Sequence, residues 1–412
     1  MRRKESTKRR DFLRATGSLT AAGVLGSLAG CVGGGDSGGN PGSGGTSDGS
    51  STSTGSGGGS AATGGNETVR NEFDLANLDY SLEDQLNVFQ WTDYWPQGTV
   101  KKFEQAYGVT VNVANYASNE EMFNKLKAGG TGQFDLIFPS DYMINILAEQ
   151  NMIRTLELKK IPSWENLEKK WINESPYDPG EKRYSAPYQW GTSGIGTNTQ
   201  MADADVTAWE TMWDEQYEGQ ITMLDDMRET IGAALKRLGY SLNTTEEAKI
   251  TEAKELLIEQ KPLLLKYEST TTPELLINKQ ASPIHLWSGD AFRAYWELYD
   301  DEKGSSPIQY EVPKDGGVVW VDTAAVTKQA KHPNAAHAFI NYVLNARANA
   351  MITNYVYYAT PNEAAKQYVD DAALDNPSIY PPKEVMKKLE FIKNIGQATQ
   401  LYSEAWTEIQ NA

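Results

Sequence analysis

Strand-like and helix-like hydrophobic periods alternate three times between residues 86 and 149, and this alternation restricts the fold more than any other feature of the sequence. The predicted strands are 86–91, 109–116 and 134–139, and the predicted helices are 98–107, 118–128 and 142–149. Three strand–helix units in a row form a mainly parallel sheet with helices on both faces. The sequence therefore predicts an α/β fold.

The same pattern continues later in the chain. Further strands are predicted at 220–224, 283–287 and 317–321, and further helices are predicted to end at Leu238 and to span 335–344. These strands end in an aromatic residue, an acid or both. Ligands of open α/β sheets bind outside the carboxyl ends of the strands, so these strand ends are candidate ligand contacts.

The stretch 87–98, NVFQWTDYWPQG, contains the densest group of such residues. Trp91, Tyr94 and Trp95 surround Asp93 just after the first predicted strand. The segment 140–142, Ser-Asp-Tyr, follows the third strand and therefore reaches the same edge of the sheet. We expect a ligand site where these two segments meet.

The first 30 residues have the features of a signal peptide. Lys8-Arg9-Arg10-Asp11-Phe12-Leu13 is a twin-arginine pattern, an apolar stretch follows, and Leu28-Ala29-Gly30-Cys31 is a small-residue cleavage site. The alternative is a transmembrane anchor, but the apolar run is short and rich in Gly and Ser for a bilayer core of about 30 Å. The pattern favours a twin-arginine lipoprotein signal at 1–30, with lipid on Cys31.

Residues 31–69 are predicted to form a disordered tether after the lipidated cysteine. This stretch is mostly Gly, Ser, Thr and Asp, and such a composition cannot bury enough apolar area to fold. The folded body then begins near residue 70 and contains about 340 residues, which suggests two lobes. We expect the protein on the extracellular face of the membrane, held there by its lipid.

The chain is strongly acidic. Its net charge is −17, and removal of residues 1–30, which hold seven Lys or Arg and two Asp or Glu, leaves about −22. This charge is compatible with a basic partner, but an acidic surface that keeps a protein soluble in high salt explains it better. The charge and the absence of a basic segment argue against nucleic acid binding. Because Cys31 is the only cysteine, the sequence predicts neither a disulfide framework nor a thiolate metal site.

Nine local motifs, spread in order over about 320 residues, resemble the spermidine/putrescine-binding proteins of ABC importers. These motifs are QWTDY (90–94), SNEEMFNKLKAG (118–129), FDLIFPSDY (134–142), WGTSGIGTN (190–198), LDDMRE (224–229), LGY (238–240), LWSGDA (286–291), GGVVWVD (316–322) and YATPNEAA (358–365). The family consists of extracellular solute-binding proteins of the type II periplasmic fold. Each motif alone is weak, whereas nine in order are specific.

The resemblance implies two α/β lobes joined by crossing strands, with a polyamine held in the cleft between them. Lobe 1 would comprise 84–197 and 321–366, and lobe 2 would comprise 198–320 and 367–412. The family's ligand contacts would correspond to Thr92, Asp93, Tyr94, Tyr142, Asp226, Glu229, Trp287, Trp320, Asp322 and Tyr358. A monomer that delivers its ligand to ABC permease subunits is expected, with neither cofactor nor metal.

The chemistry of these residue types suits a polyamine, which is an aliphatic rod with two or more ammonium groups. Aromatic rings cover its methylenes and attract its charges, at about 0.5–2 kcal/mol for each cation–π contact. Carboxylates add charge-assisted hydrogen bonds of roughly 1.5–3 kcal/mol each. In molar salt, where the Debye length is about 3 Å, these short contacts matter more than the net charge.

Several of these residues have a structural alternative. Asp226 and Glu229 have the spacing of a helix capping box, and Trp287 and Trp320 end apolar strands and could be core residues. Tyr358 lies in the run Tyr355-Val356-Tyr357-Tyr358, so its register is ambiguous by one residue.

Three positions depart from the family's pattern. Ile392 stands where many members have a Gln, Ser288-Gly289-Asp290 stands where an Asn-Gly is common, and Gln90 replaces a frequent Asn. These departures leave open which polyamine is bound, and whether another cationic solute is preferred.

Other functions have less support in the sequence. The three histidines, His285, His332 and His337, do not have the spacing of a shared metal site, and the sequence has neither an H-E-x-x-H nor a Walker motif. We therefore expect a binding protein rather than an enzyme. Ferric iron, a sugar or an anion are alternative ligands, although acids at the strand ends argue against an anion. A sensory binding protein that serves a receptor is a further alternative.

Overall fold

A computed structural model of the protein describes residues 65–75, 77–92, 94–173, 177–202 and 206–412. The predicted signal peptide, Cys31, nearly all of the predicted tether and Asp93 lie outside the described residues. Everything below concerns the described part of the chain.

The described body is built around one ten-stranded sheet with the order β2-β1-β3-β9-β4-β7-β5-β6, to which β10 adds beside β9 and β8 beside β4. The strands are β1 (Gln85–Trp91), β2 (Thr110–Tyr116), β3 (Leu136–Ile137), β4 (Ser185–Asn198), β5 (Ile221–Met223), β6 (Leu264–Tyr267), β7 (Ile284–Trp287), β8 (Ile308–Glu311), β9 (Gly317–Val326) and β10 (Leu389–Glu390). The predicted α/β class is therefore confirmed.

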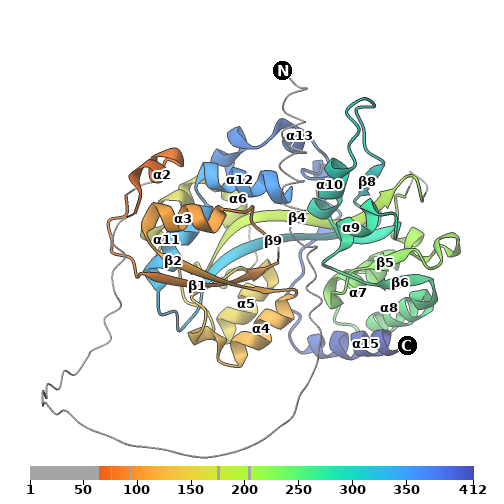
Figure 1. The fold of residues 1–412 in the computed structure, drawn as a ribbon. Coiled ribbons are helices and arrows are strands. Elements are labelled where there is room, and N and C mark those ends of the chain that lie inside the picture. Colours follow the sequence, from red (N-terminus) through yellow and green to blue (C-terminus); the bar gives the residue numbers. More distant parts are fainter. Residues whose placement is uncertain (1–64, 76, 93, 174–176, 203–205) are drawn as a thin grey trace, which may run out of the picture. The chain divides into compact units, whose positions relative to one another are not determined.

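The two flanks of the sheet are parallel, and its middle is antiparallel. β1 pairs in parallel with β2 and β3 on one flank, and β5 pairs in parallel with β6 and β7 on the other. β4 and β9 pair with each other in antiparallel fashion. β9 is also antiparallel to β3 on the first flank, and β4 is antiparallel to β7 on the second. Figure 1 shows β4 and β9 running side by side between the part that holds β1 and β2 and the part that holds β5 and β6.

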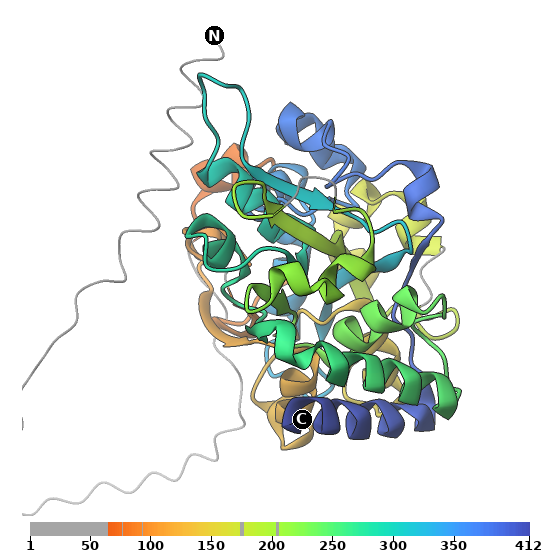
Figure 2. The same ribbon diagram turned by 90° about the vertical axis from the view of Figure 1, so that its right-hand side faces the viewer.

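Helices cover this sheet. They are α2 (Glu67–Glu72), α3 (Thr99–Tyr107), α4 (Asn119–Lys127), α5 (Asp141–Glu149), α6 (Lys169–Asn173), α7 (Met227–Arg237), α8 (Glu247–Gln260), α9 (Thr272–Ile277), α10 (Ser288–Glu297), α11 (Pro333–Val343), α12 (Ala346–Val356), α13 (Asp371–Leu374), α14 (Lys383–Met386) and α15 (Thr399–Asn411). On the β5–β6 flank, α7, α8 and α15 share one apolar cluster through Ile231, Leu257 and Tyr402. Figure 2 shows α15 lying along α8.

Two predicted strands differ from the observed ones by more than one residue at an end. β3 forms over Leu136–Ile137 instead of 134–139, since it pairs at only two positions with each neighbour. β9 does not end at Val321, as predicted, but continues to Val326. Asp322 and Thr323 remain in the strand because the ladder with β4 extends beyond them. Polar residues that looked like a strand end therefore lie inside a buried strand.

A variant of the capping box forms at the start of α4. Ser118 Oγ accepts a hydrogen bond from Glu121 N at 3.1 Å. The Glu121 carboxylate in turn accepts from Ala117 N at 2.8 Å, one residue earlier than in the standard box. This cap fixes the turn between the end of β2 and α4, and so positions residues 116–120 beside the end of β1.

The predicted lobe division remains a prediction. Its boundaries at 197/198 and 320/321 fall within β4 and β9, respectively, which cross from one flank to the other. All residues of both strands are buried, so the crossing is part of the core and not an exposed linker.

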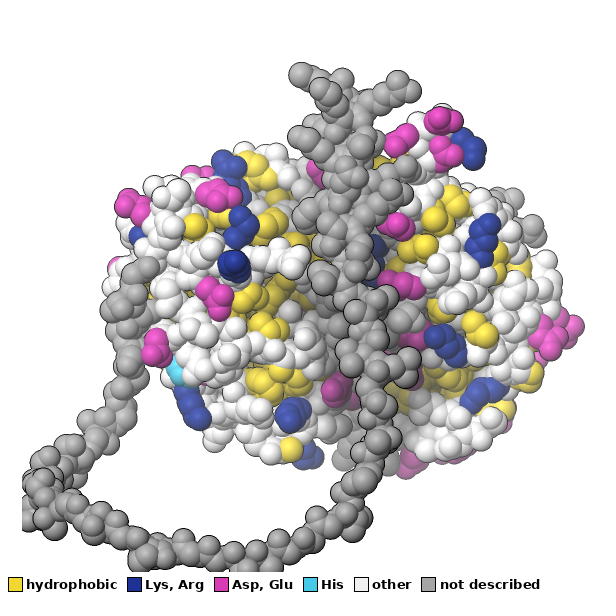
Figure 3. Space-filling model, in the orientation of Figure 1, with side chains coloured by type: hydrophobic (Ala, Val, Ile, Leu, Met, Phe, Trp, Pro, Cys, Tyr) yellow, Lys and Arg dark blue, Asp and Glu magenta, His cyan; other side chains and the backbone are white. Residues whose placement is uncertain are grey.

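The surface of the described body carries mixed charge on the side that Figure 3 shows, where Lys and Arg side chains lie among Asp and Glu side chains rather than in one basic patch. No helix in the described ranges is both long enough and apolar enough to cross a membrane.

Candidate functional site

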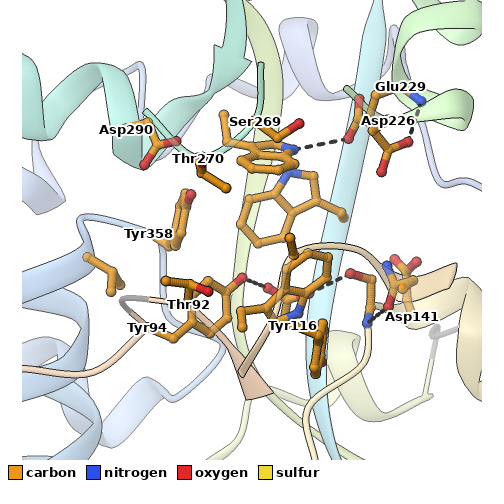
Figure 4. A pocket seen from close by; sticks show the side chains of 18 of the residues that line it. Thr92, Tyr94, Tyr116, Asp141, Asp226, Glu229, Ser269, Thr270, Asp290 and Tyr358 are labelled. Carbon is orange, nitrogen blue, oxygen red and sulfur yellow. Dashed lines mark hydrogen bonds between the residues drawn. The ribbon is translucent and has the colours of Figure 1, made fainter. Parts of the chain in front are cut away.

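Nine of the ten predicted ligand contacts line a single pocket of about 1050 Å³, a volume that includes its open mouth. These nine are Thr92, Tyr94, Tyr142, Asp226, Glu229, Trp287, Trp320, Asp322 and Tyr358. The tenth, Asp93, lies outside the described residues. Figure 4 shows Asp226 and Glu229 on one side of the pocket, Tyr94 and Tyr358 on another, and Asp290, Ser269 and Thr270 along a third.

Asp322 provides a fixed acid on the β9 side. Its side chain is 1 % exposed, and its carboxylate accepts hydrogen bonds from the Tyr94 hydroxyl, from Ser140 Oγ at 2.8 Å and from Gln189 Nε2 at 3.5 Å. Burial raises the pKa of Asp322 to about 6, although the three donors favour the ionised form. Near neutral pH this group is therefore mostly a preorganised anion.

The indole of Trp320 and the ring of Tyr358 form a corner beside this acid. Their centroids are 4.8 Å apart and their planes meet at 84°. Gly191 pairs with Trp320 across the sheet, and a Cβ there would lie 2.5 Å from Trp320 Cζ2. A Cβ on Gly289 would likewise lie 2.5 Å from Tyr358 Cε1. Two glycines of the sequence motifs thus leave the room that the two rings occupy.

Trp91 and Trp287 bring the two flanks together at the pocket. Their rings meet edge to face with centroids 6.4 Å apart, and Trp91 Nε1 donates to Phe138 O at 3.0 Å. Tyr116, at the end of β2, packs on Trp91 at 4.9 Å. The core interpretation of the tryptophans is partly right: Trp320 is only 7 % exposed, yet it also lines the pocket.

Glu229 lies on the opposite side, in the first turn of α7. Its Oε1 accepts from Ser193 Oγ at 2.8 Å and from Trp287 Nε1 at 3.3 Å. Burial, together with the nearby charge of Asp226, raises the pKa of Glu229 to about 8. This acid is therefore largely protonated at neutral pH when the pocket holds no cation.

Asp226 has two roles in the structure. It is the N-cap of α7, where its Oδ1 accepts from Arg228 N at 2.9 Å and from Glu229 N at 3.0 Å, and it also lines the pocket. The capping alternative is thus confirmed for Asp226. Glu229 does not complete a capping box, because its carboxylate turns toward Ser193 and Trp287.

Tyr142 connects a further acid to the pocket. Its hydroxyl donates to Glu120 Oε1 at 3.1 Å, and burial raises the pKa of Glu120 to about 7. Asp141, the residue before Tyr142, accepts hydrogen bonds from Tyr142 N at 2.6 Å and from Val321 N at 3.1 Å. Asp141 therefore joins the start of α5 to β9 and holds Tyr142 and Asp322 in register.

The mouth near α10 carries the one lysine or arginine among the described lining residues. Arg293 Nη2 is 3.9 Å from Asp290 Oδ1 and 3.9 Å from Glu274 Oε1, and Asp290 also accepts from Thr272 Oγ1 at 3.0 Å. Five carboxylates, those of Asp141, Asp226, Glu229, Asp290 and Asp322, line the same pocket. The balance of charge therefore favours a cation.

Several lining residues were not predicted as contacts. These are Trp91, Tyr116, Ala117, Asn119, Ser140, Asp141, Ser269, Thr270, Asp290, Arg293, Tyr355, Val356 and Ile392, of which Asp290 and Ile392 had been noted as departures from the family's pattern. Trp91, Tyr116 and Asp141 stand at strand ends, and that position was a usable signal. Ser269 and Thr270 lie in the loop after β6, and no local pattern of the sequence indicates that this loop reaches the pocket.

The arrangement can hold a small organic cation by ring faces and carboxylates. Among the described residues there is no group of three His, Cys, Asp or Glu side chains that could hold a metal ion. Tyr358 is in the register that the sequence motif indicated, and Tyr355 also lines the pocket, whereas Tyr357 packs against Phe292 at 5.1 Å.

Comparison with protein families matches residues 98–381 to a family described as bacterial extracellular solute-binding protein. The chain is 32 % identical over 339 residues to the spermidine/putrescine-binding periplasmic protein 1 of Haemophilus influenzae, covering 82 % of this chain and 92 % of that protein. It is 31 % identical over 326 residues to the spermidine/putrescine-binding periplasmic protein of Escherichia coli, covering 79 % and 91 %.

Solved structures give the same result for the fold. A putative spermidine/putrescine ABC transporter protein from Listeria monocytogenes superimposes with a TM-score of 0.74 at 31 % identity, covering 80 % of this chain and 99 % of that one. A lipoprotein of Treponema pallidum superimposes with a TM-score of 0.70 at 29 % identity, covering 79 % and 99 %. These matches confirm the predicted type of solute-binding fold.

Proposed function

The chain belongs to the bacterial extracellular solute-binding protein family, and on this premise we propose that it captures a polyamine, spermidine or putrescine, and delivers it to an ABC permease. The relatives from Haemophilus influenzae and Escherichia coli carry spermidine and putrescine in their names, and the pocket supplies the chemistry that such a ligand needs. Members of this family are solute-binding transport proteins, so the chain is a carrier and not an enzyme.

The observation that carries the proposal is the buried carboxylate of Asp322 beside the corner formed by Trp320 and Tyr358. An ammonium group on Asp322 would gain a charge-assisted hydrogen bond of about 1.5–3 kcal/mol. The adjoining methylenes would lie on ring faces and lose contact with water. A second ammonium group would meet Asp226 or Glu229 on the other side of the pocket (Figure 4).

The remaining predicted contacts are proposed as follows. Thr92 and Tyr94 would contact the ligand after β1, and Asp93 is proposed to anchor one ammonium group. Tyr142 would contact the ligand from the start of α5, and Trp287, whose ring meets that of Trp91, would cover it from the end of β7. Ile392, which lines the pocket, would contribute only apolar surface, and this favours methylenes at that point.

We further propose that the protein works as a monomeric lipoprotein on the outer face of the cell membrane. The twin-arginine pattern and the cysteine at position 31 support export and lipid attachment, and the acidic composition supports a high-salt habitat. The test is a Cys31→Ala substitution in the full chain, followed by fractionation of cells. The variant should move from the membrane to the medium, and retention in the membrane would contradict the anchor.

Thermal unfolding in high salt tests the ligand class directly. A ligand present at 100 times its Kd stabilises the native state by about 2.7 kcal/mol, which is easily measured. Putrescine and spermidine should raise the unfolding temperature, whereas sugars, ferric iron and phosphate should not. If neither amine stabilises the protein and one of the others does, the proposed ligand class is wrong.

A further inference from the structure

A buried histidine lies directly behind the wall of the pocket. His285, on β7, is 0 % exposed, and neither Nδ1 nor Nε2 has a hydrogen-bond partner in the described part of the protein. The ring of Trp209 stands edge-on to the imidazole at 4.9 Å and 80°. An enclosed imidazole without partners is unusual, because buried polar groups are nearly always hydrogen-bonded.

Glu229 has an unpaired atom that faces this histidine. Its Oε1 is hydrogen-bonded by Ser193 and Trp287, but Oε2 is buried without a partner in the described residues, 3.9 Å from His285 Nε2. The pairing of β4 with β7 sets Ser193 opposite Trp287 and Ile195 opposite His285. Ser193, His285 and Trp287 therefore project from the same face of the sheet, toward the first turn of α7.

One proton would pair Glu229 Oε2 with His285 Nε2, and the Nδ1–H of the neutral imidazole would keep no hydrogen-bond partner among the described residues. A protonated Glu229 Oε2 can donate to the neutral imidazole after an approach of about 1 Å, since such hydrogen bonds need about 2.9 Å. Leaving both groups unpaired would cost roughly 1–3 kcal/mol each. Burial lowers the pKa of His285 to about 3, so the ring is neutral, and raises the pKa of Glu229 to about 8, so the acid holds the proton.

The other groups around Glu229 act in both directions. Asp226 on α7 and Asp141 on α5 are negative neighbours that favour the protonated acid, and the Tyr310 hydroxyl on β8 is a neutral neighbour that burial keeps protonated. Ser193 and Trp287 donate to Oε1 and favour the ionised form. Arg228, the cation next to Glu229 on α7, turns its guanidinium to Lys393 O and Asn243 Oδ1, so the positive charge that ionises Glu229 is expected from the pocket side.

We propose, on the premise that the ligand is a polyamine, that Glu229 and His285 share one proton in the free protein and release it when an ammonium group enters the pocket. The Oε2–H bond of Glu229 breaks, its proton leaves to solvent, and the ligand's N–H donates to the resulting carboxylate. His285 does not contact the ligand. It is a positioning residue, because it stabilises the protonated state of Glu229 from behind.

Titration calorimetry of the full-length protein with putrescine tests this proposal. Primary amines have ordinary pKa values near 10.4, like that of lysine, so putrescine stays fully charged between about pH 6 and pH 8. Titrations at pH 7 in two buffers with different ionisation enthalpies give the number of protons released. The wild-type protein should release between about half a proton and one proton, and its Kd should decrease by about tenfold or more from pH 6 to pH 8.

Three variants separate the residues. Glu229→Gln should lose most of the proton release and most of the pH dependence. His285→Leu removes the acceptor, so it should release fewer protons and shift the pH dependence to lower pH. His285→Gln keeps an acceptor in place of Nε2 and should behave like the wild-type protein.

The outcomes distinguish this proposal from the proposed function. If wild-type protein binds putrescine or spermidine with no proton release and a constant Kd, the proton-coupled step is wrong while the ligand class stands. If His285→Leu releases as many protons as the wild-type protein, the role of His285 is wrong. If the wild-type protein binds neither amine, the proposed function fails, and this proposal fails with it.

Discussion

Asp322 and Glu229 are the two most enclosed pocket acids that were predicted as ligand contacts, and the protein treats them in opposite ways. Both side chains are buried. Three side-chain donors bond to the carboxylate of Asp322, whereas Oε2 of Glu229 has no hydrogen-bond partner among the described residues. The pKa of Asp322 is about 6 and that of Glu229 about 8. Equal burial therefore gives different charge states at neutral pH.

The difference shows that hydrogen-bond donors and neighbouring charge, not burial alone, decide whether a buried acid is ionised before a cation arrives. The β9 side of the pocket offers a negative charge before the ligand arrives. At neutral pH Glu229, on the α7 side, is largely protonated and, as proposed above, ionises when a positive group enters the pocket. Four experiments, in order of decreasing expected effect, can break or sharpen this contrast.

Replacing the preorganised anion should have the largest effect. Asp322→Asn removes the charge and turns an amide N–H toward the hydroxyl donors of Tyr94 or Ser140. We expect polyamine affinity to fall by about 2–3 kcal/mol, or roughly 30- to 150-fold, because a charge-assisted hydrogen bond is lost. Calorimetry with spermidine measures this, and Ser140→Ala, which removes one donor only, should have a smaller effect. Similar affinities for wild type and Asp322→Asn would remove Asp322 from the site.

The free protein should become less stable as pH rises, on account of Glu229. Its pKa is raised from 4.5 to about 8 in the folded state, so its contribution is fully present below about pH 4.5 and is lost as the pH rises through about 8. We expect a loss on the order of 2 kcal/mol between pH 5 and pH 8.5, measured by thermal unfolding at constant high salt. Glu229→Gln should show a flatter profile, and an unchanged profile would mean that Glu229 ionises freely.

The fit of Trp320 against Gly191 gives a third test. In Gly191→Ala the added methyl group would lie 2.5 Å from the indole, so the ring has to move away from the side of Asp322. We expect a stability loss of about 1–2 kcal/mol and a roughly tenfold weaker affinity. Gly232→Ala on α7 is the control, because its Cβ would meet only Leu242 Cβ at 3.5 Å and should not destabilise the protein. Wild-type affinity in Gly191→Ala would show that the indole position is not critical.

The contact between α5 and the segment before α15 should matter least. Asn394 Nδ2 donates to Asn145 Oδ1 at 3.0 Å and to Glu149 Oε2 at 3.2 Å. Asn394→Ala should accelerate ligand release by about two- to fivefold, which corresponds to about 0.5–1 kcal/mol for partly exposed hydrogen bonds. Stopped-flow tryptophan fluorescence measures the rate, with Gln400→Ala as an exposed control outside the contact. A release rate equal to that of the wild-type protein would show that this contact does not hold the ligand in.

Local sequence patterns predicted much of the fold and of the site. β1, β2, α3, α5 and α11 follow directly from hydrophobic period, and the strand-end rule led to Tyr94 and Tyr142. The same rule pointed to Trp320 and Asp322 through the strand end predicted at Val321, although β9 continues past it, and the motif resemblance singled them out as ligand contacts. β9 extends through Asp322 only because β4 pairs with it there.

The partnership of Glu229 and His285 could not be read from the sequence. The two residues are 56 positions apart, and what brings them together is the register between β4 and β7 and the packing of α7 on that face. The i, i+3 spacing of Asp226 and Glu229 predicted a cap, and Asp226 does cap α7. The same spacing could not indicate that Glu229 would turn away from the helix start, since a distant serine and tryptophan supply its donors.

Trp320 and Asp322 lie two residues apart on β9, and this placement fixes the distance between an apolar contact and a charged contact of the pocket. Side chains at i and i+2 of a strand stand on the same face, about 6.5–7 Å apart along the chain. Any swing of one flank against the other would alter the gap between Trp91 and Trp287, yet it would leave this spacing untouched. A ligand whose ammonium group lies too far from its methylene chain would therefore miss either Asp322 or Trp320, however tightly the pocket closed around it.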